Sequence, residues 1–400
     1  MNKLAQAGRD LGLLVGAFAL PVPWLWLHFV VGSEPGANAT AVLAGLAILG
    51  SAFLLSWAVE LGERDMPQSL ALLILALVSV LPEYAVDLAL AVKAAQDPAW
   101  LPYPIANMTG ANRLLIGFGW AAVVLMACSR SKSKSLEIPL HHRLEIRYLL
   151  IATLYSFVIP LSGTLSLFDA AVVLVIFFAY ALAAARGHSE EVELVGPAAW
   201  IDWRTETFGR RVAATVMLVF AAIAIIAAAE PFASSLVEIG RESAIDEFIL
   251  IQWVAPLASE SPEFLVALMF AWRHRGSVGL GALISSKVNQ WTLLVGALPI
   301  AYAIVRGEAV GMPLDARQTQ ELWLTSAQSL LATLLVCNFS FSRIEAVVLA
   351  VLFGVQLFFP SSEVRIVFCA LYLALFAILL IASPERRRAF LAILRPEPRD

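Results

Sequence analysis

Two short stretches decide the fold of this chain: SVLPE at residues 79–83 and SESPE at residues 259–263. Each stretch places a proline and a glutamate inside a long apolar segment. A charged side chain at the centre of a bilayer costs about 2.5 to 3.5 kcal/mol on insertion scales. A proline there also removes a backbone donor and frees a carbonyl oxygen that lipid cannot satisfy. A chain that accepts both costs at matching places in its two halves is typical of a membrane transporter that builds one ion site from two half-sites.

The composition around these stretches agrees with a membrane protein. Of the 400 residues, 60% are hydrophobic and only 14% are charged, whereas about a quarter of the residues of a soluble domain are charged. Apolar runs of about 18 to 28 residues recur along the chain, and each is long enough to cross a bilayer. We therefore expect an all-α polytopic membrane protein with about twelve transmembrane helices. The expected spans are 11–31, 38–60, 66–95, 101–128, 145–162, 166–186, 210–237, 245–272, 277–305, 320–340, 343–360 and 363–383.

The basic residues predict the orientation of these helices, because lysine and arginine are enriched in cytoplasmic loops. With a cytoplasmic N-terminus, 20 of the 27 basic residues fall on the cytoplasmic side, 5 on the other side and 2 inside the membrane. We expect both termini in the cytoplasm of a cell with a bacterial-type plasma membrane. An alternative is that the first segment is a signal peptide, since residues 37–39 form a small-x-small cleavage pattern. Cleavage would leave eleven spans in the same orientation.

The similarity between the two stretches extends upstream, because VELG at residues 59–62 matches VEIG at 237–240. Equivalent helices of the two copies are five spans apart. Because this number is odd, the second copy crosses the membrane in the opposite orientation to the first. Inverted repeats that meet at the midplane are a recurring design of secondary transporters. We expect a five-plus-five core with one extra helix at each end. The expected parts are an extra helix at 1–37, the first half at 38–186, a cytoplasmic linker at 187–209, the second half at 210–360, and an extra helix with a basic tail at 361–400.

The repeats resemble those of the calcium/cation antiporter superfamily, whose best-known members are sodium/calcium exchangers. That family carries a Gly-Thr-Ser-x-Pro-Glu element followed by a Gly-Ser-Asn-x-x-Asn element. The first element has counterparts at residues 78–83 and 258–263. Counting 24 residues onward from each glutamate reaches Asn107 and Lys287, and a second register in the first copy uses Asn112.

The resemblance covers residues 38–130 and 210–306. It implies a secondary antiporter that exchanges Na⁺, H⁺ or Ca²⁺ by alternating access and is not an enzyme. It implies no cofactor. The expected partners are the lipid bilayer and small inorganic cations, with no nucleic acid.

The two glutamates of the Pro-Glu steps, Glu83 and Glu263, are the strongest candidate ion ligands, and we expect them to face each other near the middle of the membrane. Hard cations prefer carboxylate, hydroxyl and carbonyl oxygens. Pro82 and Pro262 are expected to open the helices and release carbonyls. The serines four residues before each glutamate lie on the same helical face, so their hydroxyls suit ion coordination, although bonding to the i−4 carbonyl is an alternative. These serines are Ser79 and Ser259.

Further polar residues extend the candidate site. Asp87 follows Glu83 by four residues, and two acids on one face favour binding of a cation or proton between them, unless Asp87 lies near the outer water. Glu260 adds a ligand or faces a polar cavity. The remaining candidates are uncharged, and helix-to-helix hydrogen bonding is the alternative interpretation of their amides. They are Asn107, Asn112, Ser286 and Gln290.

Two basic residues lie inside predicted spans. Lys287 stands where the family resemblance implies Asn or an acid, and it lies about 15 Å into its helix at about 1.5 Å per residue. We expect it to pair with Glu83 or Glu263 and to act as a built-in cation that an incoming ion displaces, which favours monovalent or proton-coupled exchange. The alternative is a locked salt bridge that disables transport. Arg113 keeps its proton, and we expect it to be a structural partner of an acid such as Asp87.

Two other functional classes remain open from the sequence. A non-transporting scaffold would have a locked Lys-Glu core. An intramembrane enzyme could use paired acids for proton transfer, but it would also need a nucleophile or metal set, which the sequence does not show.

Overall fold

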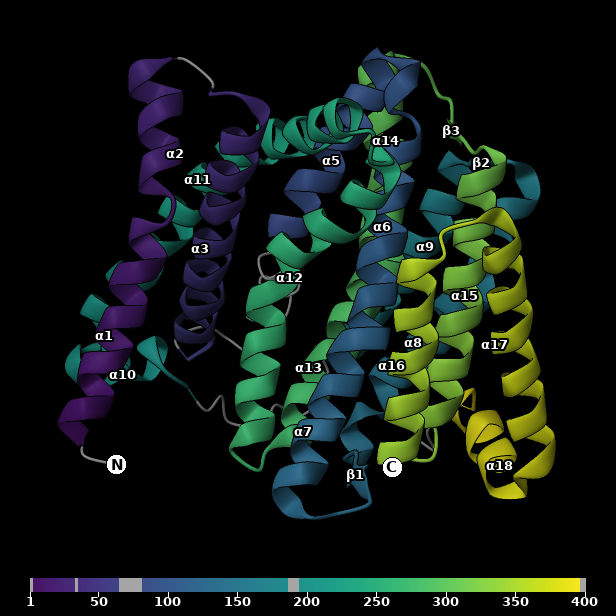
Figure 1. The fold of residues 1–400 in the computed structure, drawn as a ribbon. Helices are drawn as coiled ribbons and strands as arrows, with labels where there is room; N and C mark the ends of the chain where they lie inside the picture. The colour runs from purple at the N-terminus through teal and green to yellow at the C-terminus, as the bar shows by residue number, and fades with distance from the viewer. Residues whose placement is uncertain (1–2, 33–34, 65–80, 186–193, 396–400) are drawn as a thin grey trace. The chain divides into compact units, whose positions relative to one another are not determined.

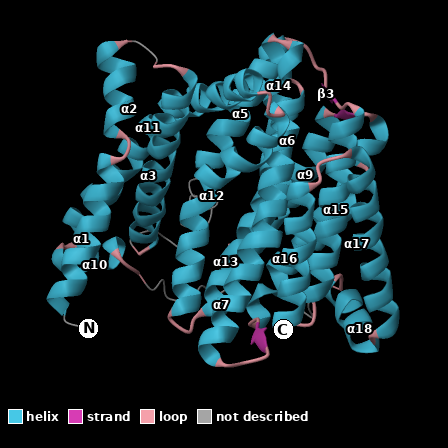
Figure 2. Ribbon diagram, viewed as in Figure 1, coloured by secondary structure: helices cyan, strands magenta, loops and turns pink. Residues whose placement is uncertain are grey.

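The computed structural model describes residues 3–32, 35–64, 81–185 and 194–395, and nearly all of them are helical (Figures 1 and 2). The prediction of an all-α membrane protein is confirmed. The exceptions are two short antiparallel strand pairs, which the sequence analysis did not anticipate. One joins β1 (Ser135–Glu137) to β4 (Ser340–Ser342), and the other joins β2 (Thr164–Leu165) to β3 (Met312–Pro313).

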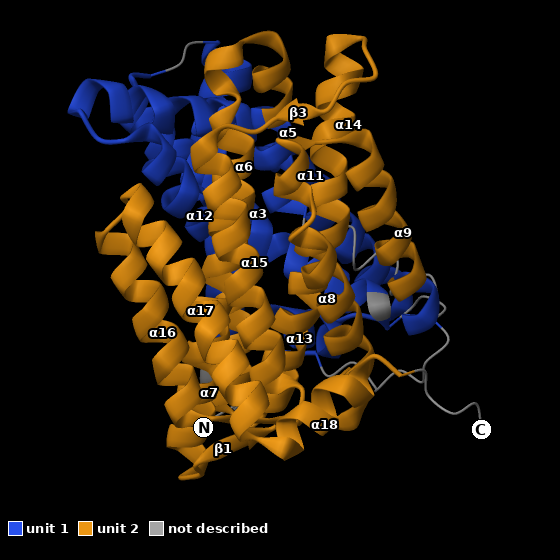
Figure 3. Cartoon of the chain, turned by 90° about the vertical axis from the view of Figure 1, so that its right-hand side faces the viewer, with its two compact units in different colours: residues 1–90, 181–262 blue, residues 91–180, 263–400 orange. Residues whose placement is uncertain are grey.

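The chain divides into two compact units, each built from two separate stretches of sequence (Figure 3). Unit 1 comprises residues 1–90 and 181–262, and unit 2 comprises residues 91–180 and 263–400. Each unit therefore combines parts of both halves of the sequence. Three helices contribute residues to both units: α5 (Leu81–Gln96), α9 (Leu167–Ala184) and α12 (Glu247–Trp272).

Unit 1 is organised around α3 and α11, which pack along each other. These helices carry the VELG and VEIG motifs at residues 59–62 and 237–240, so the equivalent helices of the two repeats lie side by side. Gly45 allows their close approach, because a Cβ there would lie 3.0 Å from the ring of Phe232. Besides its parts of the shared helices, unit 1 contains α1 (Lys3–Ala19), α2 (Val22–Trp26), η1 (Leu27–Val31), α3 (Ala37–Glu63), α10 (Pro197–Arg204) and α11 (Thr207–Ser243).

The short helix α10 lies in the segment predicted as a linker and is tied to both long helices of unit 1. Its Asp202 pairs with Arg64, directly after α3, and with Arg210 of α11, the latter at 2.8 Å. The chain between the halves is therefore anchored where α3 ends and α11 begins.

Unit 2 contains the second element of each repeat, and in both repeats this element has the same form. An α-helix runs into a π-helical turn and then into a second α-helix, as α6–η3–α7 and as α13–η6–α14. Single π-helical turns inside α-helices are rare and often mark functional sites. The bounds are α6 (Pro102–Leu114), η3 (Leu115–Trp120), α7 (Ala121–Ser131), α13 (Gly276–Asn289), η6 (Gln290–Leu294) and α14 (Val295–Arg306).

The remaining helices of unit 2 surround these elements. Two of them begin with a capping box, in which the N-cap side chain and the N3 side chain satisfy each other's backbone N–H groups; the N-caps are Asp315 and Ser342. Helices α15 and α17 run side by side (Figure 1). The bounds are η2 (Pro98–Trp100), η4 (Leu140–His142), α8 (Arg143–Ser156), η5 (Ile159–Ser162), α15 (Ala316–Val336), α16 (Arg343–Phe358), α17 (Ser362–Ala382) and α18 (Pro384–Ile393).

Within the described residues, nine helical segments are long and apolar enough to cross a membrane. The other three predicted spans differ for identifiable reasons. The span predicted at 66–95 lies partly outside the described residues, and α16 has only 16 residues. Helix α15 is rich in polar side chains, but they are buried inside the protein, so its low hydropathy reflects protein neighbours rather than water.

The Pro-Glu step in the second repeat does not interrupt its helix. Helix α12 is continuous through both Pro256 and Pro262, so it is not broken there, and a kink at the Pro-Glu step stays a prediction. Pro262 has no N–H and still leaves the carbonyl of Ala258 without its usual helical donor. In the first repeat, α5 begins at Leu81, and the residues before it lie outside the described part of the chain.

Candidate cation site

The first repeat contributes two acids to unit 1, at the start of α5. Glu83 is 3% exposed and Asp87, one helical turn later, is fully buried. Pro82 lies in α5, two residues into the part of this helix that the structure describes. Ser79 lies outside the described residues. The predicted pair of acids therefore shares one helical face in the protein interior.

The second repeat contributes Ser259 and Glu260 to unit 1, both buried in α12. The Ser259 hydroxyl donates to the carbonyls of Ala255 and Pro256, at 3.3 Å each. This is the backbone-bonding alternative anticipated for Ser259. The lone pairs of its oxygen are still directed away from those bonds, so the residue keeps an acceptor.

In unit 2, Glu263 is held by a serine from the next helix. The hydroxyl of Ser286 on α13 donates to Oε2 of Glu263 at 2.8 Å. Glu263 is half-buried and Ser286 is buried. The neighbouring Ser285 instead bonds the hydroxyl of Tyr180 at 2.8 Å. Of these two adjacent serines, Ser286 orients the candidate carboxylate.

Lys287 is fully buried and binds an amide of the first repeat. Its ammonium donates to Oδ1 of Asn112 at 2.5 Å and lies 3.3 Å from the main-chain oxygen of the same residue. The amide nitrogen of Asn112 in turn donates to the carbonyl of Met108 at 2.8 Å, which fixes the amide so that its oxygen accepts. The ammonium also lies 4.4 Å from the centre of the Trp291 ring, a favourable cation–π distance.

The π-helical turns define how the two repeats correspond in this region. Asn112 precedes the start of η3 by three residues, and Lys287 precedes the start of η6 by three residues. The turns therefore align Asn112 with Lys287, which is the second of the two registers considered from the sequence. Equivalent residues of inverted repeats touch each other only near the axis that relates the repeats. The contact between Asn112 and Lys287 thus lies near that axis.

Asn107 is the residue that the other register would align with Lys287, and its environment differs from that of Asn112. It is fully buried in α6, and neither of its amide atoms has a hydrogen-bond partner among the described residues. A buried amide without partners is costly, so this side chain is available to a ligand. Gln290, the first residue of η6, is also fully buried.

Arg113 pairs with Glu321 of α15, with 2.6 Å between Nη2 and Oε2. Its Nη1 also donates to Oε1 of Gln356 at 3.3 Å. The predicted structural role as partner of an acid thus involves Glu321, which the sequence analysis did not single out. That analysis placed Glu321 at the end of a predicted span, whereas the structure buries it.

Two further buried polar residues in unit 1 were missed, Ser51 in α3 and Gln252 in α12. The Ser51 hydroxyl and the amide nitrogen of Gln252 have no hydrogen-bond partner among the described residues. The signal that could have found both is a single polar residue inside an otherwise apolar span.

Comparison with known proteins decides the family. Residues 38–185 and 213–362 match the sodium/calcium exchanger protein family. The chain belongs to that family. It is therefore a cation antiporter of the membrane, and the predicted family resemblance is confirmed.

Several solved structures share the fold of this family member. The crystal structure of the H⁺/Ca²⁺ exchanger CAX is 43% identical, with a TM-score of 0.91 over 97% of this chain and 98% of that chain. YfkE is 14% identical, with a TM-score of 0.61 over 91% and 99% of the two chains. The sodium-calcium exchanger NCX_Mj is 17% identical, with a TM-score of 0.55 over 81% and 98%. A search of curated proteins found no match.

Proposed function

We propose that this antiporter exchanges a metal cation, with Ca²⁺ as the first candidate, against protons. The observation that carries the proposal is the buried ammonium of Lys287 on Oδ1 of Asn112. A buried amine gives up its proton readily, and here it occupies an oxygen that would otherwise be free to bind a metal ion. Proton release from Lys287 and cation binding are therefore mutually linked.

The ligand chemistry supports the cation half of the exchange. We assign Glu83 and Glu263 as the principal cation ligands, one from each repeat, with Asp87 and Glu260 as further acids. Carboxylates, amide oxygens and hydroxyls are the groups that Ca²⁺ prefers. Ser286 orients Glu263 through its hydrogen bond, and Asn107 offers an amide oxygen with no protein partner among the described residues.

The similarity to CAX supports the proton half. CAX is an H⁺/Ca²⁺ exchanger and is 43% identical over nearly the whole chain. Titratable groups in the membrane interior are typical of proton-coupled transport. Lys287 and the acids of the two repeats supply such groups here. The distribution of basic residues supports a topology with both termini in the cytoplasm.

The test is flux in proteoliposomes containing the purified protein. We expect a pH gradient to drive Ca²⁺ uptake by the wild-type protein, and we expect Glu83→Gln and Glu263→Gln each to abolish it, because the amide keeps the volume but loses the charge. Glu247→Gln is the matched control, since Glu247 lies at the start of α12, the helix of Glu263, and pairs with Arg241. It should transport normally.

Na⁺, K⁺ and Ca²⁺ are varied one at a time against each gradient. If a sodium gradient drives uptake and a pH gradient does not, the protein couples transport to Na⁺ and the proposal of proton coupling is wrong. Normal flux in both glutamine variants would show that these carboxylates are structural. A folded wild-type protein with no flux under any gradient would favour the locked scaffold.

A further inference from the structure

Helix α11 of unit 1 exposes a stripe of apolar side chains along its first half. The members recur every three or four residues, which is the spacing of one helical face, and each is at least 45% exposed. Because α11 is long and apolar enough to cross a membrane, we take this stripe as its lipid-facing side. The stripe consists of Phe208, Val212, Val216, Val219, Ile223 and Ile226.

The short helix α10 ends just before this stripe begins, and it is fixed to the rest of unit 1. Ala198 and Ile201 of α10 are buried in one core cluster together with residues of α3 and α11. Asp202 pairs with Arg64, directly after α3, and with Arg210 of α11. Helix α10 is therefore a firmly held element at the point where α3 ends and α11 begins.

The outer side of α10 carries an exposed arginine held between tryptophan rings. The guanidinium of Arg204 lies 5.1 Å from the centre of the Trp200 ring and 5.8 Å from that of Trp203, both within cation–π range. Trp203 is 76% exposed. A second exposed arginine, Arg211, follows Phe208 by three residues and so lies on the same side of α11 as the start of the stripe.

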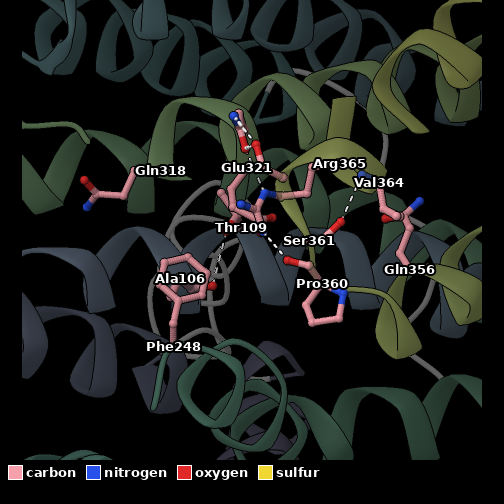
Figure 4. A network of polar contacts seen from close by, with 12 residues as sticks. Ala106, Thr109, Phe248, Gln318, Glu321, Gln356, Pro360, Ser361, Val364 and Arg365 are labelled. Atoms are coloured by element: carbon pink, nitrogen blue, oxygen red, sulfur yellow. Dashed lines mark hydrogen bonds and ion pairs between the residues drawn. The ribbon is translucent and has the colours of Figure 1, made fainter. Parts of the chain in front are cut away.

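Arg204 differs from the arginines in the protein interior. In unit 2, for example, Arg365 lies 3.7 Å from Glu321 and also donates to the carbonyl of Pro360 (Figure 4). A guanidinium keeps its positive charge in a protein, and Arg365 satisfies that charge within the chain. Arg204 is exposed and forms no ion pair among the described residues. Its N–H groups are therefore directed to an acceptor outside the chain.

The chemistry of this surface fits a phosphate at the edge of a bilayer. Tryptophan is enriched at the membrane–water interface, and arginine binds phosphate through paired N–H donors. Basic side chains next to a membrane span attract anionic lipids. Between residues 197 and 212 the arginines outnumber the acids and leave a positive surface; the arginines are Arg204, Arg210 and Arg211, and the acids are Asp202 and Glu206.

We propose that Trp203, Arg204 and Arg211 form a binding site for an anionic phospholipid. The phosphate of the headgroup lies against the two arginines, and the acyl chains follow the stripe that begins at Phe208. The bound lipid ties α10 to the membrane surface, and through Asp202 it ties the end of α3 and the start of α11 as well. The site does not depend on which ions the protein exchanges.

The experiment follows the melting temperature of the purified protein in an uncharged detergent as phosphatidylglycerol is added, and repeats the titration with phosphatidylcholine of the same acyl chains. A lipid that binds the folded protein raises its melting temperature, and we expect phosphatidylglycerol to act at lower concentrations. Arg204→Gln should weaken its binding about fivefold, and the double variant with Arg211→Gln about twenty-five-fold, because each basic residue near an anionic surface contributes a factor of about five. Arg204→Lys keeps the charge and should keep most of the affinity.

Arg241→Gln is the matched control. Arg241 lies at the other end of α11 and pairs with Glu247 at 3.4 Å, so its loss should leave the preference for phosphatidylglycerol unchanged. Glycerol phosphate, which has the same phosphate chemistry but no acyl chains, should not raise the melting temperature at the concentrations where the lipid does.

A wild-type protein that responds equally to the two lipids would overturn the proposal. An unchanged preference in a folded Arg204→Gln variant, or an equal loss in Arg241→Gln, would overturn it as well. Stabilisation by glycerol phosphate alone would make a free phosphate the ligand and exclude a lipid site. If the double variant does not fold, Arg204→Gln decides, because this change breaks no ion pair among the described residues. The measurement uses no ion gradient, so a failure of the proposed function in the flux assay is a separate result.

Discussion

The two elements α6–η3–α7 and α13–η6–α14 have the same sequence of α- and π-helical conformations, but they differ in the charge of one aligned residue. Both pass from α-helix to π-helix three residues after the aligned pair Asn112 and Lys287. The first element supplies an amide oxygen at this place, and the second supplies a cation that binds it. The comparison shows that two inverted repeats can keep the same backbone conformation while a side chain of one repeat binds the aligned side chain of the other.

The two elements also differ in how they support the acids of the Pro-Glu steps. Ser286 donates to Glu263, whereas the first repeat carries an alanine at the equivalent place in either register, Ala106 or Ala111. The second repeat therefore has a hydroxyl that the first lacks. The two candidate carboxylates are expected to differ in their affinity for a cation.

The largest effect is expected from removing the charge difference between the aligned residues. Lys287→Asn makes the two repeats alike, and we expect it to make transport more dependent on Ca²⁺ and to shift its pH optimum, because the internal cation is gone. Lys287→Arg should abolish transport, since a guanidinium cannot release its proton and its planar fork is larger than an ammonium.

Ion dependence and pH profile are measured for the wild-type protein and both variants in the same vesicles. A single shared profile for all three proteins would remove Lys287 from the mechanism. Asn112→Asp serves as the reciprocal change, because a carboxylate there should hold the ammonium more tightly and slow the exchange.

A smaller effect is expected from the glycines that follow the aligned pair. A Cβ on Gly117 in η3 would lie 2.2 Å from Cγ and 2.4 Å from Cβ of Phe353, which is rigidly attached to α16. A Cβ on Gly296 would meet the more flexible end of Leu174 at 2.9 Å. Overpacking costs about 1 to 3 kcal/mol, so we expect Gly117→Ala to lower the melting temperature clearly and Gly296→Ala to lower it less. Equal losses in the two variants would mean that the two elements are packed alike.

The smallest effect is expected from the serine that distinguishes the repeats. Ser286→Ala removes the hydrogen bond to Glu263, and a loss of about 1 kcal/mol corresponds to roughly a fivefold rise in the half-saturating cation concentration. Ser285→Ala is the adjacent control, because Ser285 bonds Tyr180 and not the acid. Uptake measured over a range of Ca²⁺ concentrations distinguishes them, and equal behaviour of the two variants would contradict the role of Ser286.

The sequence alone was sufficient to predict those features of the fold and site that depend on a local residue pattern. The Pro-Glu steps and the VELG and VEIG motifs identified the inverted repeat and the family, because the cost of a charge or proline in lipid is a local property. The choice between Asn107 and Asn112 stayed open, since the second family element is degraded in both copies and a count of residues from the glutamate does not fix the alignment. The structure resolves this choice through the matching positions of η3 and η6.

Features that depend on distant parts of the chain were not accessible in the same way. Glu321 and Arg113 are more than two hundred positions apart and meet only through the packing of α6 against α15. Glu321 is the second residue of the span predicted at 320–340, and hydropathy alone does not distinguish burial of such a residue in protein from exposure to water. The helical continuity of α12 through Pro262 was also missed, because neighbouring helices can support a helix that lacks one hydrogen bond.

The interleaving of the two units has a consequence for synthesis and membrane insertion. Unit 1 is complete once residue 262 has been made, whereas unit 2 needs residues up to the end of the chain. Helix α6 therefore enters the bilayer carrying Asn112 and Arg113 long before Lys287 and Glu321 have been translated. During that interval the nascent helix has to be sheltered by the insertion machinery or remain near the membrane surface. A ribosome that stops after the first repeat would release a chain with an unfinished polar helix, which is the kind of intermediate that membrane quality control removes.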